Sequence, residues 1–421
     1  MGRLEVREAK QFWGEIRPPS DKSITHRAYM ISALSEDGGL VETPLVAEDC
    51  QRTLQALRDL GVRVLPTGDS LRIAGPPFRT PARGLYCGNS GTTMRLMAGM
   101  LAGADLSVRL EGDASLSRRP MRRIVEPLML MGAQISGDTP PLRIEPSKLH
   151  GIRYTTPIPS AQVKSAILLA GLSAQGETSV TESLLSRDHT ERMLEAAGCE
   201  IERSGPTVRI SPGSPKSVRV RVPADISSAA FFLVGGALLG GPVTAKDVGV
   251  NPTRTGVLDV LRQAGAKVQI TPPTHEQGEP VADVAVEMQD QLQPFIIRSD
   301  QVPGLIDEIP ILAVLATQCH GTSEIRGAAE LRVKESDRIG AIASGLRRMG
   351  VTVETFDDGM AITGPARMVG AVIDAKKDHR IGMAFAIAGL IAKEDTVIQG
   401  AETIDTSFPG FESELKRFSR V

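Results

Sequence analysis

Residues 53–76 read TLQALRDLGVRVLPTGDSLRIAGP, and the order of features in this stretch predicts the fold. An amphipathic helix ends at Gly61, and two alternating strands separated by a polar Gly-Asp turn follow it. Glycine suits a helix end because it adopts the left-handed conformation without a steric penalty from Cβ. The stretch therefore predicts a helix followed by a β-hairpin.

The same plan returns along the chain. Its further copies are IVEPLMLMGAQISGDTPPLRIEPS (124–147), MLEAAGCEIERSGPTVRISPGSP (193–215) and AIASGLRRMGVTVETFDDGMAITGPA (341–366). VLDVLRQAGAKVQITPP (257–273) is a copy with a longer turn, and FESELKRF (411–418) is a sixth helix without a hairpin. The copies indicate an internal repeat.

Five glycines that end these helices set the length of the repeat: Gly61, Gly132, Gly198, Gly265 and Gly350. Their spacing gives a unit of roughly 70 residues, three in each half of the chain. We predict an α/β protein of two pseudo-threefold domains. Helix–glycine–strand order is common in any α/β protein, and the shared helix and hairpin lengths favour the repeat over that alternative.

Proline-containing segments mark the boundary between the halves. A strand expected at Val218–Val222 leads through Pro223 into a helix expected from Ser227, and Pro18-Pro19 must break the first strand. We predict one domain at residues 18–223 and a second formed by 1–17 with 224–421. The hinges are expected near 17–20 and 223–226.

Composition excludes several classes of protein. The 421 residues carry 48 Lys plus Arg against 50 Asp plus Glu and only 3% aromatic residues, which argues against a nucleic-acid-binding surface. No apolar stretch reaches the roughly 20 residues of a membrane span, and the charged N-terminus argues against secretion. Cys50, Cys87, Cys199 and Cys319 form no metal-binding spacing, so we expect four buried, reduced thiols in a cytoplasmic protein.

Cationic residues gather at expected helix starts in the first half. PPSDKSITHRAYM (18–30) places Lys22 with His26, and Ser23 with Arg27, on shared helix faces. CGNSGTTMRLM (87–97) combines glycines with an arginine, and SLSRRPMRRIVEPL (115–128) has four arginines in six residues. Free N–H groups and the positive end of the helix dipole suit such positions to anions.

The second half has similar clusters. RVKESDRIGA (332–341) is expected to place Lys334 and Arg338 on one helical face with Glu335 beside them. KKDHRIGMAFA (376–386) places His379 and Arg380 before an apolar helix, and Asp307 with Glu308 precedes another apolar run at 302–316.

Each cluster alone is compatible with a solvated surface, and a single histidine with a structural role. Together they fall at strand–helix junctions of the repeats, which can converge on a cleft. In a chain of net charge −2, such a cleft predicts a compact, multiply anionic small ligand.

Eight ordered motifs make the chain similar to the 5-enolpyruvylshikimate-3-phosphate synthases. They are PSDKSITHR, GNSGTTMR, SRRPM, PSAQVKSA, SRDHTERM, LIDEIPILA, VKESDR and DHR. The resemblance covers the chain from Pro18 to Pro409. Arg187–Glu191, Ser160–Lys164 and Asn251–Arg254 resemble the second sequence class of that family, which includes glyphosate-tolerant forms.

The resemblance implies a fold, an activity and a set of partners. The fold is a two-domain inside-out α/β barrel with three βαβαββ repeats in each domain and the active site in the interdomain cleft. The reaction transfers the carboxyvinyl group of phosphoenolpyruvate to the 5-hydroxyl of shikimate 3-phosphate and releases phosphate, on the way to chorismate and aromatic amino acids. No metal or organic cofactor is implied, and we expect a cytoplasmic monomer with small-molecule substrates, no nucleic acid and no membrane.

Site residues follow from the resemblance position by position. Shikimate 3-phosphate is expected to contact Lys22, Ser23, Arg27, Ser160, Ala161, Gln162, Arg187, Asp307 and Lys334. Phosphoenolpyruvate is expected to contact Lys22, Gly91, Arg119, Gln162, Arg338 and Arg380. Seven of these side chains are cations, which would balance the five or so negative charges of the two substrates. Domain closure is expected to exclude water and to make binding ordered or synergistic.

The expected chemistry needs two proton transfers, because the 5-hydroxyl loses a proton while the methylene carbon of phosphoenolpyruvate gains one. We predict Asp307 as the base, and Glu335 or Lys22 as the donor to carbon. Gly91 predicts that glyphosate competes with phosphoenolpyruvate. Thr406 stands where many family members have a lysine that binds phosphoenolpyruvate, which puts one contact in question.

Three other functions can be weighed against these residues. The enolpyruvyl transferase that acts on UDP-N-acetylglucosamine shares the fold, but Ser23 follows Lys22 here and residues 113–123 contain no cysteine. A non-catalytic anion-binding module would gain nothing from Asp307 and Glu335. A nucleic-acid enzyme of related fold is disfavoured by the charge balance.

Overall fold

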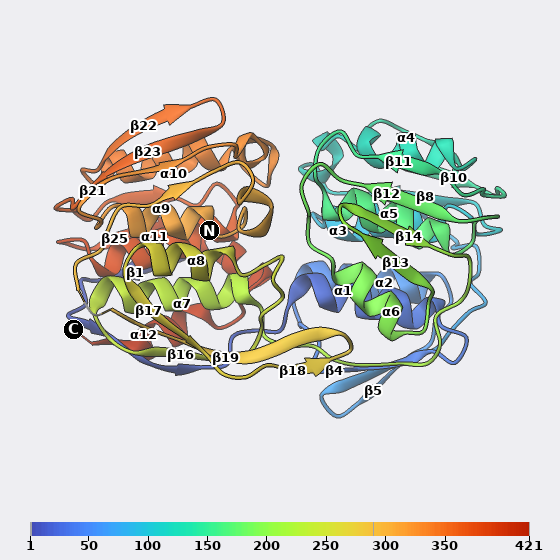
Figure 1. The fold of residues 1–421 in the computed structure, drawn as a ribbon, viewed down its shortest axis with the longest axis horizontal. Coiled ribbons are helices and arrows are strands. Elements are labelled where there is room, and N and C mark those ends of the chain that lie inside the picture. The colour runs from blue at the N-terminus through green and yellow to red at the C-terminus, as the bar shows by residue number, and fades with distance from the viewer. Residues whose placement is uncertain (1, 289, 421) are drawn as a thin grey trace. The chain divides into compact units, whose positions relative to one another are not determined.

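The computed structural model describes residues 2–288 and 290–420, which divide into two compact units (Figure 1). Unit 1 contains residues up to Pro19, Pro223–Thr274 and Pro280 onwards, and unit 2 contains Ser20–Val222 with His275–Glu279. Residues 275–279, predicted for the C-terminal domain, thus pack with unit 2. The chain therefore crosses from one unit to the other at 274–275 and again at 279–280, in addition to the two expected crossings.

Unit 2 contains three four-stranded sheets built on one plan. In each, an edge strand runs parallel to its neighbour, and that neighbour pairs antiparallel with the second strand of the hairpin. The first sheet has the order β15 (Val218–Arg221), β4 (Gly39–Glu42), β6 (Ser70–Ile73), β5 (Val64–Thr67). The second is β7 (Leu85–Tyr86), β8 (Val108–Glu111), β10 (Leu142–Glu145), β9 (Gln134–Ser136). The third is β11 (Arg153–Thr155), β12 (Thr178–Thr181), β14 (Thr207–Ile210), β13 (Ile201–Ser204).

Each repeat of unit 2 contributes two helices of different character. The first helices are α1 (Lys22–Leu34), α3 (Gly91–Leu101) and α5 (Ala161–Gly171), whose residues are buried almost throughout. The second helices are α2 (Glu48–Asp59), α4 (Arg122–Leu130) and α6 (His189–Ala196), which bury one face. A short 3-10 helix, η1 (Leu116–Arg118), precedes α4. Apolar residues all round a helix require burial on every side, so the first helices form the centre of the unit.

Unit 1 repeats the arrangement. Its first sheet has the order β17 (Ala266–Ile270), β19 (Glu279–Met288), β16 (Val243–Gly249), β3 (Gly14–Ile16), and β18 (Thr274–Glu276) also pairs with β19. Its second sheet has the order β20 (Ile296–Ile297), β21 (Gly321–Ile325), β23 (Gly359–Gly364), β22 (Thr352–Phe356). The third consists of β1 (Arg3–Val6), β25 (Thr396–Gln399) and β24 (Val372–Asp374). β2 (Gln11–Phe12) pairs with β26 (Ser419–Arg420). The first residues of the chain therefore complete the last repeat.

The helices of unit 1 also fall into two kinds. The buried first helices are α7 (Ile226–Leu239), α9 (Ile309–Ala316) and α11 (His379–Leu390). The second helices are α8 (Gly256–Gln263), α10 (Arg338–Arg348) and α12 (Phe411–Phe418), and the 3-10 helices are η2 (Val302–Gly304), η3 (Ala329–Val333) and η4 (Ala401–Thr406).

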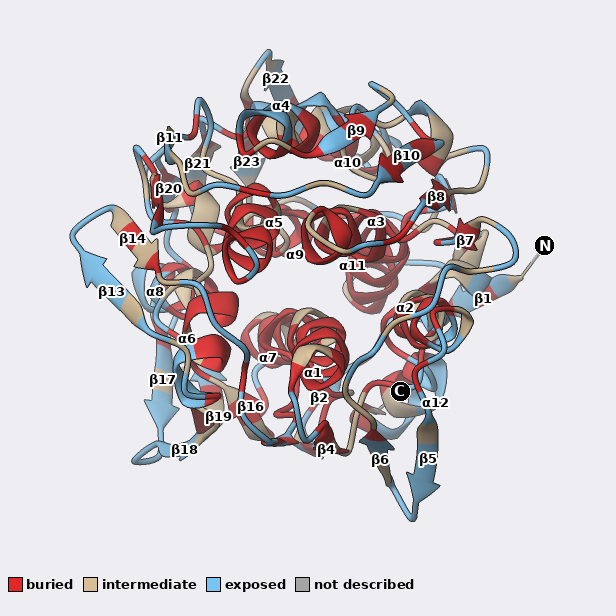
Figure 2. Cartoon of the chain, turned by 90° about the vertical axis from the view of Figure 1, so that its right-hand side faces the viewer, coloured by how far each residue is buried: buried red, intermediate tan, exposed pale blue. Residues whose placement is uncertain are grey.

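Helices lie inside each unit and the hairpins outside. In Figure 2 the ribbons of α1, α3 and α5 are red, and those of β5 and β13 are largely pale blue. Each unit has its own core of buried apolar residues. In unit 1 the rings of Phe12, Phe232, Phe408, Phe411 and Phe418 pack with centroids 5.0–5.8 Å apart, which fastens both ends of the chain to α7.

The predicted repeat is confirmed in its details. The five helix-ending glycines all have positive φ, between 82° and 95°. FESELKRF forms α12 without a hairpin, and the short β26 that follows it pairs with β2. The helix expected from Ser227 starts one residue earlier, because Asp225 caps it by accepting from Ser227 N at 2.9 Å. Cys50, Cys87 and Cys319 are buried, but Cys199 is only half-buried because it follows the helix-ending Gly198 at the edge of the core.

Among the described residues, no helix is both long and apolar enough to cross a membrane.

Replacing Gly350 by alanine tests the role of glycine at the helix ends. Gly350 has a φ of +87°, and an added Cβ would come no closer than 3.6 Å to Arg367 O, so the cost is conformational. We expect Gly350→Ala to lower the free energy of unfolding by about 1–2 kcal/mol in urea denaturation. Gly213→Ala is the control, because Gly213 has ordinary backbone geometry and open space around it. Equal free energies of unfolding for the two variants would contradict the role of glycine at the helix ends.

Candidate active site

The N-terminus of α1 places two of the predicted residues in unit 2. Asp21 caps the helix by accepting from Ile24 N at 2.8 Å, and Lys22 is its first residue. The Lys22 ammonium lies 3.1 Å from Asp49 Oδ2 and keeps part of its side chain exposed. Ser23 follows, half-buried, and its carbonyl accepts from Arg27 Nη1 at 2.9 Å. A cation and a hydroxyl therefore stand where the helix leaves its first N–H groups.

Arg27 is buried one turn further along α1. Its guanidinium donates to Thr190 Oγ1 at 2.7 Å and to Ser165 Oγ at 2.8 Å, which ties α1 to α6 and α5. Burial lowers the pKa of Arg27 to about 10, while Glu191 and Asp21 act to raise it, so the group stays charged at neutral pH. Arg187, half-exposed before α6, lies close enough to repel Arg27. Two like charges held together favour an anion beside them.

The N-termini of α3 and α5 meet through Gln162. Its amide donates to Thr92 Oγ1 at 2.9 Å, and its carbonyl oxygen accepts from Arg95 Nη1 at 2.6 Å. Ser160 caps α5, and Ala161 is the first residue of that helix, so the predicted group 160–162 lies at a helix start. The structure thus brings Gln162 and the start of α3 together, as a shared ligand contact requires.

Gly91 and Arg119 lie at the same start of α3. A Cβ on Gly91 would come within 2.9 Å of Arg95 Nη1 and 3.5 Å of Arg119 Nη1, so glycine allows two guanidinium groups to approach the backbone. Arg119 follows η1 and donates to Asn89 Oδ1. These cations surround the first turn of α3.

In unit 1, three carboxylates surround the guanidinium of Arg338. Asp378 Oδ2 accepts from Nε at 2.8 Å, Glu335 Oε2 from Nη2 at 2.8 Å and Asp307 Oδ1 from Nη1 at 3.2 Å. Arg338 is 1% exposed. Burial acts to lower its pKa, but the three carboxylates outweigh burial and raise it. Arg338 therefore keeps its charge and gathers both predicted proton-transfer carboxylates.

Arg380 joins this cluster from the start of α11. Its Nη1 donates to the Asp307 carbonyl at 3.2 Å, and its Nη2 lies 3.7 Å from Asp307 Oδ2. Thr406 ends η4, and its hydroxyl donates to Thr403 O at 2.7 Å.

One of the two predicted helix faces is wrong. Lys334 and Arg338 do not share a helical face, because Asp337 caps α10 and Lys334 lies outside it, at the end of η3. Lys22 and His26 lie four positions apart in α1, as expected, and His26 is fully buried with its Nδ1 2.7 Å from Thr53 Oγ1. Burial lowers the pKa of His26 to about 3, so the ring is neutral.

Several buried residues that hold these groups in place are not predicted as site residues from the sequence. Asp378 caps α11 and binds Arg338. Burial acts to raise the pKa of Asp378, but Arg338 and His379 together bring it below its usual value. Arg254 donates to Asp225 Oδ1 at 2.9 Å and to Ser227 Oγ at 2.8 Å at the start of α7, and Ser227 also donates to Glu308. These residues could have been predicted from the sequence, because Asp, Ser or Glu directly before an apolar stretch is typical of a helix N-terminus.

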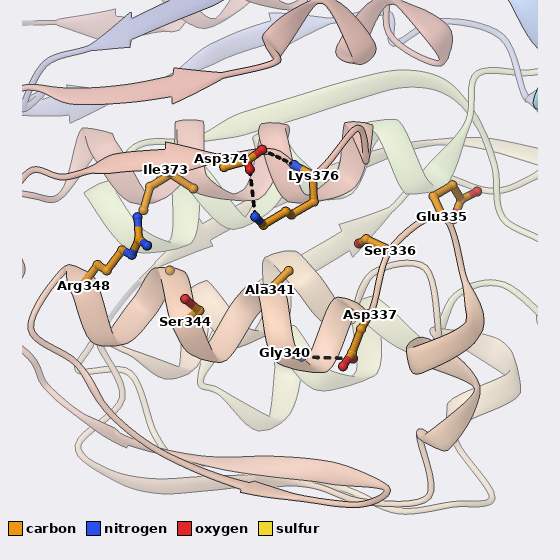
Figure 3. Close-up of a pocket in the computed structure, with 11 residues that line it drawn as sticks. Glu335, Ser336, Asp337, Gly340, Ala341, Ser344, Arg348, Ile373, Asp374 and Lys376 are labelled. Carbon is orange, nitrogen blue, oxygen red and sulfur yellow. Dashed lines mark hydrogen bonds and ion pairs between the residues drawn. The ribbon is translucent and has the colours of Figure 1, made fainter. Parts of the chain in front are cut away.

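A cavity of about 490 Å³ lies along α10 beside the loop that carries Glu335. Figure 3 shows Lys376 turned toward Asp374, and Asp337 beside Gly340 on α10. Lys376 Nζ lies 2.8 Å from Asp374 Oδ2, and Asp337 accepts from Gly340 N at 3.1 Å. In the described ranges, no cluster of His, Cys, Asp and Glu is arranged to hold a metal ion.

Comparisons with known proteins identify the family of the chain. The family model for EPSP synthase (3-phosphoshikimate 1-carboxyvinyltransferase) matches residues 6–415. A 3-phosphoshikimate 1-carboxyvinyltransferase of Brevibacillus brevis is 47% identical, over 99% of this chain and all of that protein. One from Geobacter sp. strain M21 is also 47% identical, over 98% of each. The solved structure of EPSP synthase from Acinetobacter baumannii has a TM-score of 0.88 at 44% identity and covers 99% of this chain and 98% of that one.

The neutral, buried state of His26 predicts an acid-sensitive fold. Its pKa is lowered from 6.5 to about 3, so the unfolded chain binds the additional proton and stability falls as the pH drops below 6.5. We expect the urea midpoint of His26→Gln to fall less between pH 7 and pH 4.5 than that of the unsubstituted chain. The exposed His320→Gln serves as control. An identical decrease in the His26 variant would refute the prediction.

Proposed function

The chain belongs to the EPSP synthase family, and we propose that it transfers the enolpyruvyl group of phosphoenolpyruvate to the 5-hydroxyl of shikimate 3-phosphate, with release of phosphate. The family match along nearly the whole chain and the ordered site motifs support this reaction. Addition of the hydroxyl gives a tetrahedral intermediate, which then expels phosphate.

The residues of unit 2 are proposed to hold shikimate 3-phosphate. Ser160, Ala161 and Gln162 offer a helix N-terminus, and Arg27 and Arg187 offer two neighbouring cations, which suits a phosphate dianion. Lys22 and Ser23 extend this set from the start of α1. Asp307 and Lys334 are proposed to bind hydroxyl groups of the same substrate.

Phosphoenolpyruvate is proposed to bind the remaining cations. Arg119, Arg338 and Arg380 supply guanidinium forks for its carboxylate and phosphate, while Gly91 leaves room near the helix backbone. Gln162 and Lys22 complete the set. Thr406 offers a hydroxyl where a lysine would add a further charge, so this chain relies more on the arginines.

The clustering of Asp307 and Glu335 on the buried guanidinium of Arg338 is the observation that carries the chemical proposal. An anion that binds Arg338 competes with these carboxylates for its N–H groups. A carboxylate that loses a cationic partner holds a proton more readily, which favours proton delivery only when phosphoenolpyruvate is bound. Asp307 is assigned as the base toward the 5-hydroxyl, and Glu335 or Lys22 as the donor to the methylene carbon.

The remaining assignments concern the setting of the reaction. We propose a monomer in the cytoplasm that needs no metal or organic cofactor and binds neither nucleic acid nor membrane. The near-neutral composition supports the last two points. Competition of glyphosate with phosphoenolpyruvate stays a prediction.

Phosphate release tests the function. We expect the protein to release phosphate from phosphoenolpyruvate with shikimate 3-phosphate and not with UDP-N-acetylglucosamine. Lys22→Ala should lower kcat/KM by about 10²-fold or more, because it removes a charge-assisted interaction with the reacting anions. Release with the nucleotide sugar alone would show a different acceptor, and release with neither would favour an anion-binding module.

A further inference from the structure

Glu182 is a buried carboxylate to which the reaction assigns no role. It follows β12 and is 2% exposed. Oε1 accepts from Ser160 N at 3.2 Å and from Ser186 Oγ at 2.6 Å. Oε2 accepts from Ser186 N at 3.2 Å and from Lys164 Nζ at 2.7 Å. These four hydrogen bonds use the full acceptor capacity of a carboxylate.

The same hydrogen bonds join two segments that carry proposed ligands of shikimate 3-phosphate. Ser160 begins the group 160–162 at the start of α5, and Ser186 directly precedes Arg187. The two serines are 26 positions apart in sequence. A single side chain therefore sets the distance between a helix N-terminus and the arginine expected at the same phosphate.

Lys164 ties the arrangement to α6. Its ammonium also contacts Ser186 O at 3.3 Å and Glu191 Oε1 at 2.8 Å. Glu191 follows Thr190, which accepts from Arg27. The chain of interactions from Glu182 through Lys164 to Glu191 thus reaches the neighbourhood of Arg27 as well as that of Arg187.

Burying such a group is costly for folding. A buried ion pair loses much of its attraction to desolvation, and apolar residues of equal volume often stabilise a fold as well or better. The strength of the Glu182 network is therefore a poor explanation for its presence. Its geometry, which connects two ligand-bearing segments, is the better one.

We propose that Glu182 is a positioning residue for shikimate 3-phosphate, which fixes Arg187 and the 160–162 segment at the spacing that the substrate phosphate needs. The inference rests on the proposed function. It concerns shikimate 3-phosphate above all, because Ser160, Ala161 and Arg187 in the joined segments are proposed ligands of that substrate alone, and only Gln162 is shared with phosphoenolpyruvate.

Glu182→Gln tests the proposal, because glutamine keeps the size but places an NH₂ group against donors. We expect KM for shikimate 3-phosphate, and its Kd from calorimetry, to rise about tenfold or more, the equivalent of removing one buried hydrogen bond. The kcat should change by less than about threefold. The KM for phosphoenolpyruvate should rise by a smaller factor than that for shikimate 3-phosphate, because Gln162 is the one residue of these segments that is also proposed to bind it. Glu177→Gln is the matched control, since Glu177 precedes the same strand and forms an exposed ion pair with Arg209.

Glu182→Asp covers the case in which the first variant does not fold. Aspartate keeps the negative charge beside Lys164, so this variant should fold. Its side chain is one methylene shorter and cannot contact Ser160 and Ser186 in the same way, so KM for shikimate 3-phosphate should still rise. Unchanged Kd in a folded variant, or an equal effect on both substrates and kcat, would overturn the proposal. The proposed function is tested separately, by the unsubstituted protein: if that protein turns over shikimate 3-phosphate, the proposed function stands whatever the variants show. Absence of that turnover would overturn both.

Discussion

The first helix of each repeat is buried on nearly every side, and this constraint governs where the protein can place charge. α9 and α11 bury all their residues, and α1, α3, α5 and α7 are buried along most of their length. Such helices meet polar groups mainly at their ends. Free N–H groups and the positive end of the dipole lie at the N-terminus. Anion binding is therefore the chemistry that this architecture offers most readily.

The same constraint explains the buried charges near these helix starts. A guanidinium or carboxylate placed there must be paired, because an isolated buried charge is too costly. Arg338 has Asp378, Arg254 has Asp225, and Lys164 has Glu182 with Glu191. Such buried pairs add little to stability, because desolvation offsets much of their attraction. They hold the groups that are proposed to bind the substrates in fixed positions.

Much of the fold could be predicted because it is specified locally. Periodicity, glycine at helix ends and turn residues specify each helix and hairpin, and their recurrence reveals the repeat. The positions of Lys22, Ser160 and Asp307 close to helix starts are local as well. The helix expected to carry both Lys334 and Arg338 begins only at Arg338, because Asp337 caps it by accepting from Gly340 N. Partners over long separations could not be predicted in this way. Arg27 meets Thr190, 163 positions away, and His189 lies 2.7 Å from Glu279 across 90 positions.

The central claim is that the carboxylates gathered on Arg338 carry the proton transfers, and Asp307→Asn tests it most directly. The measurement is kcat together with the urea midpoint, with Asp374→Asn, which alters an exposed pair with Lys376, as the control. We predict a fall in kcat of about 10²-fold or more for Asp307→Asn, with an almost unchanged midpoint. A kcat within about threefold of the control would contradict the account.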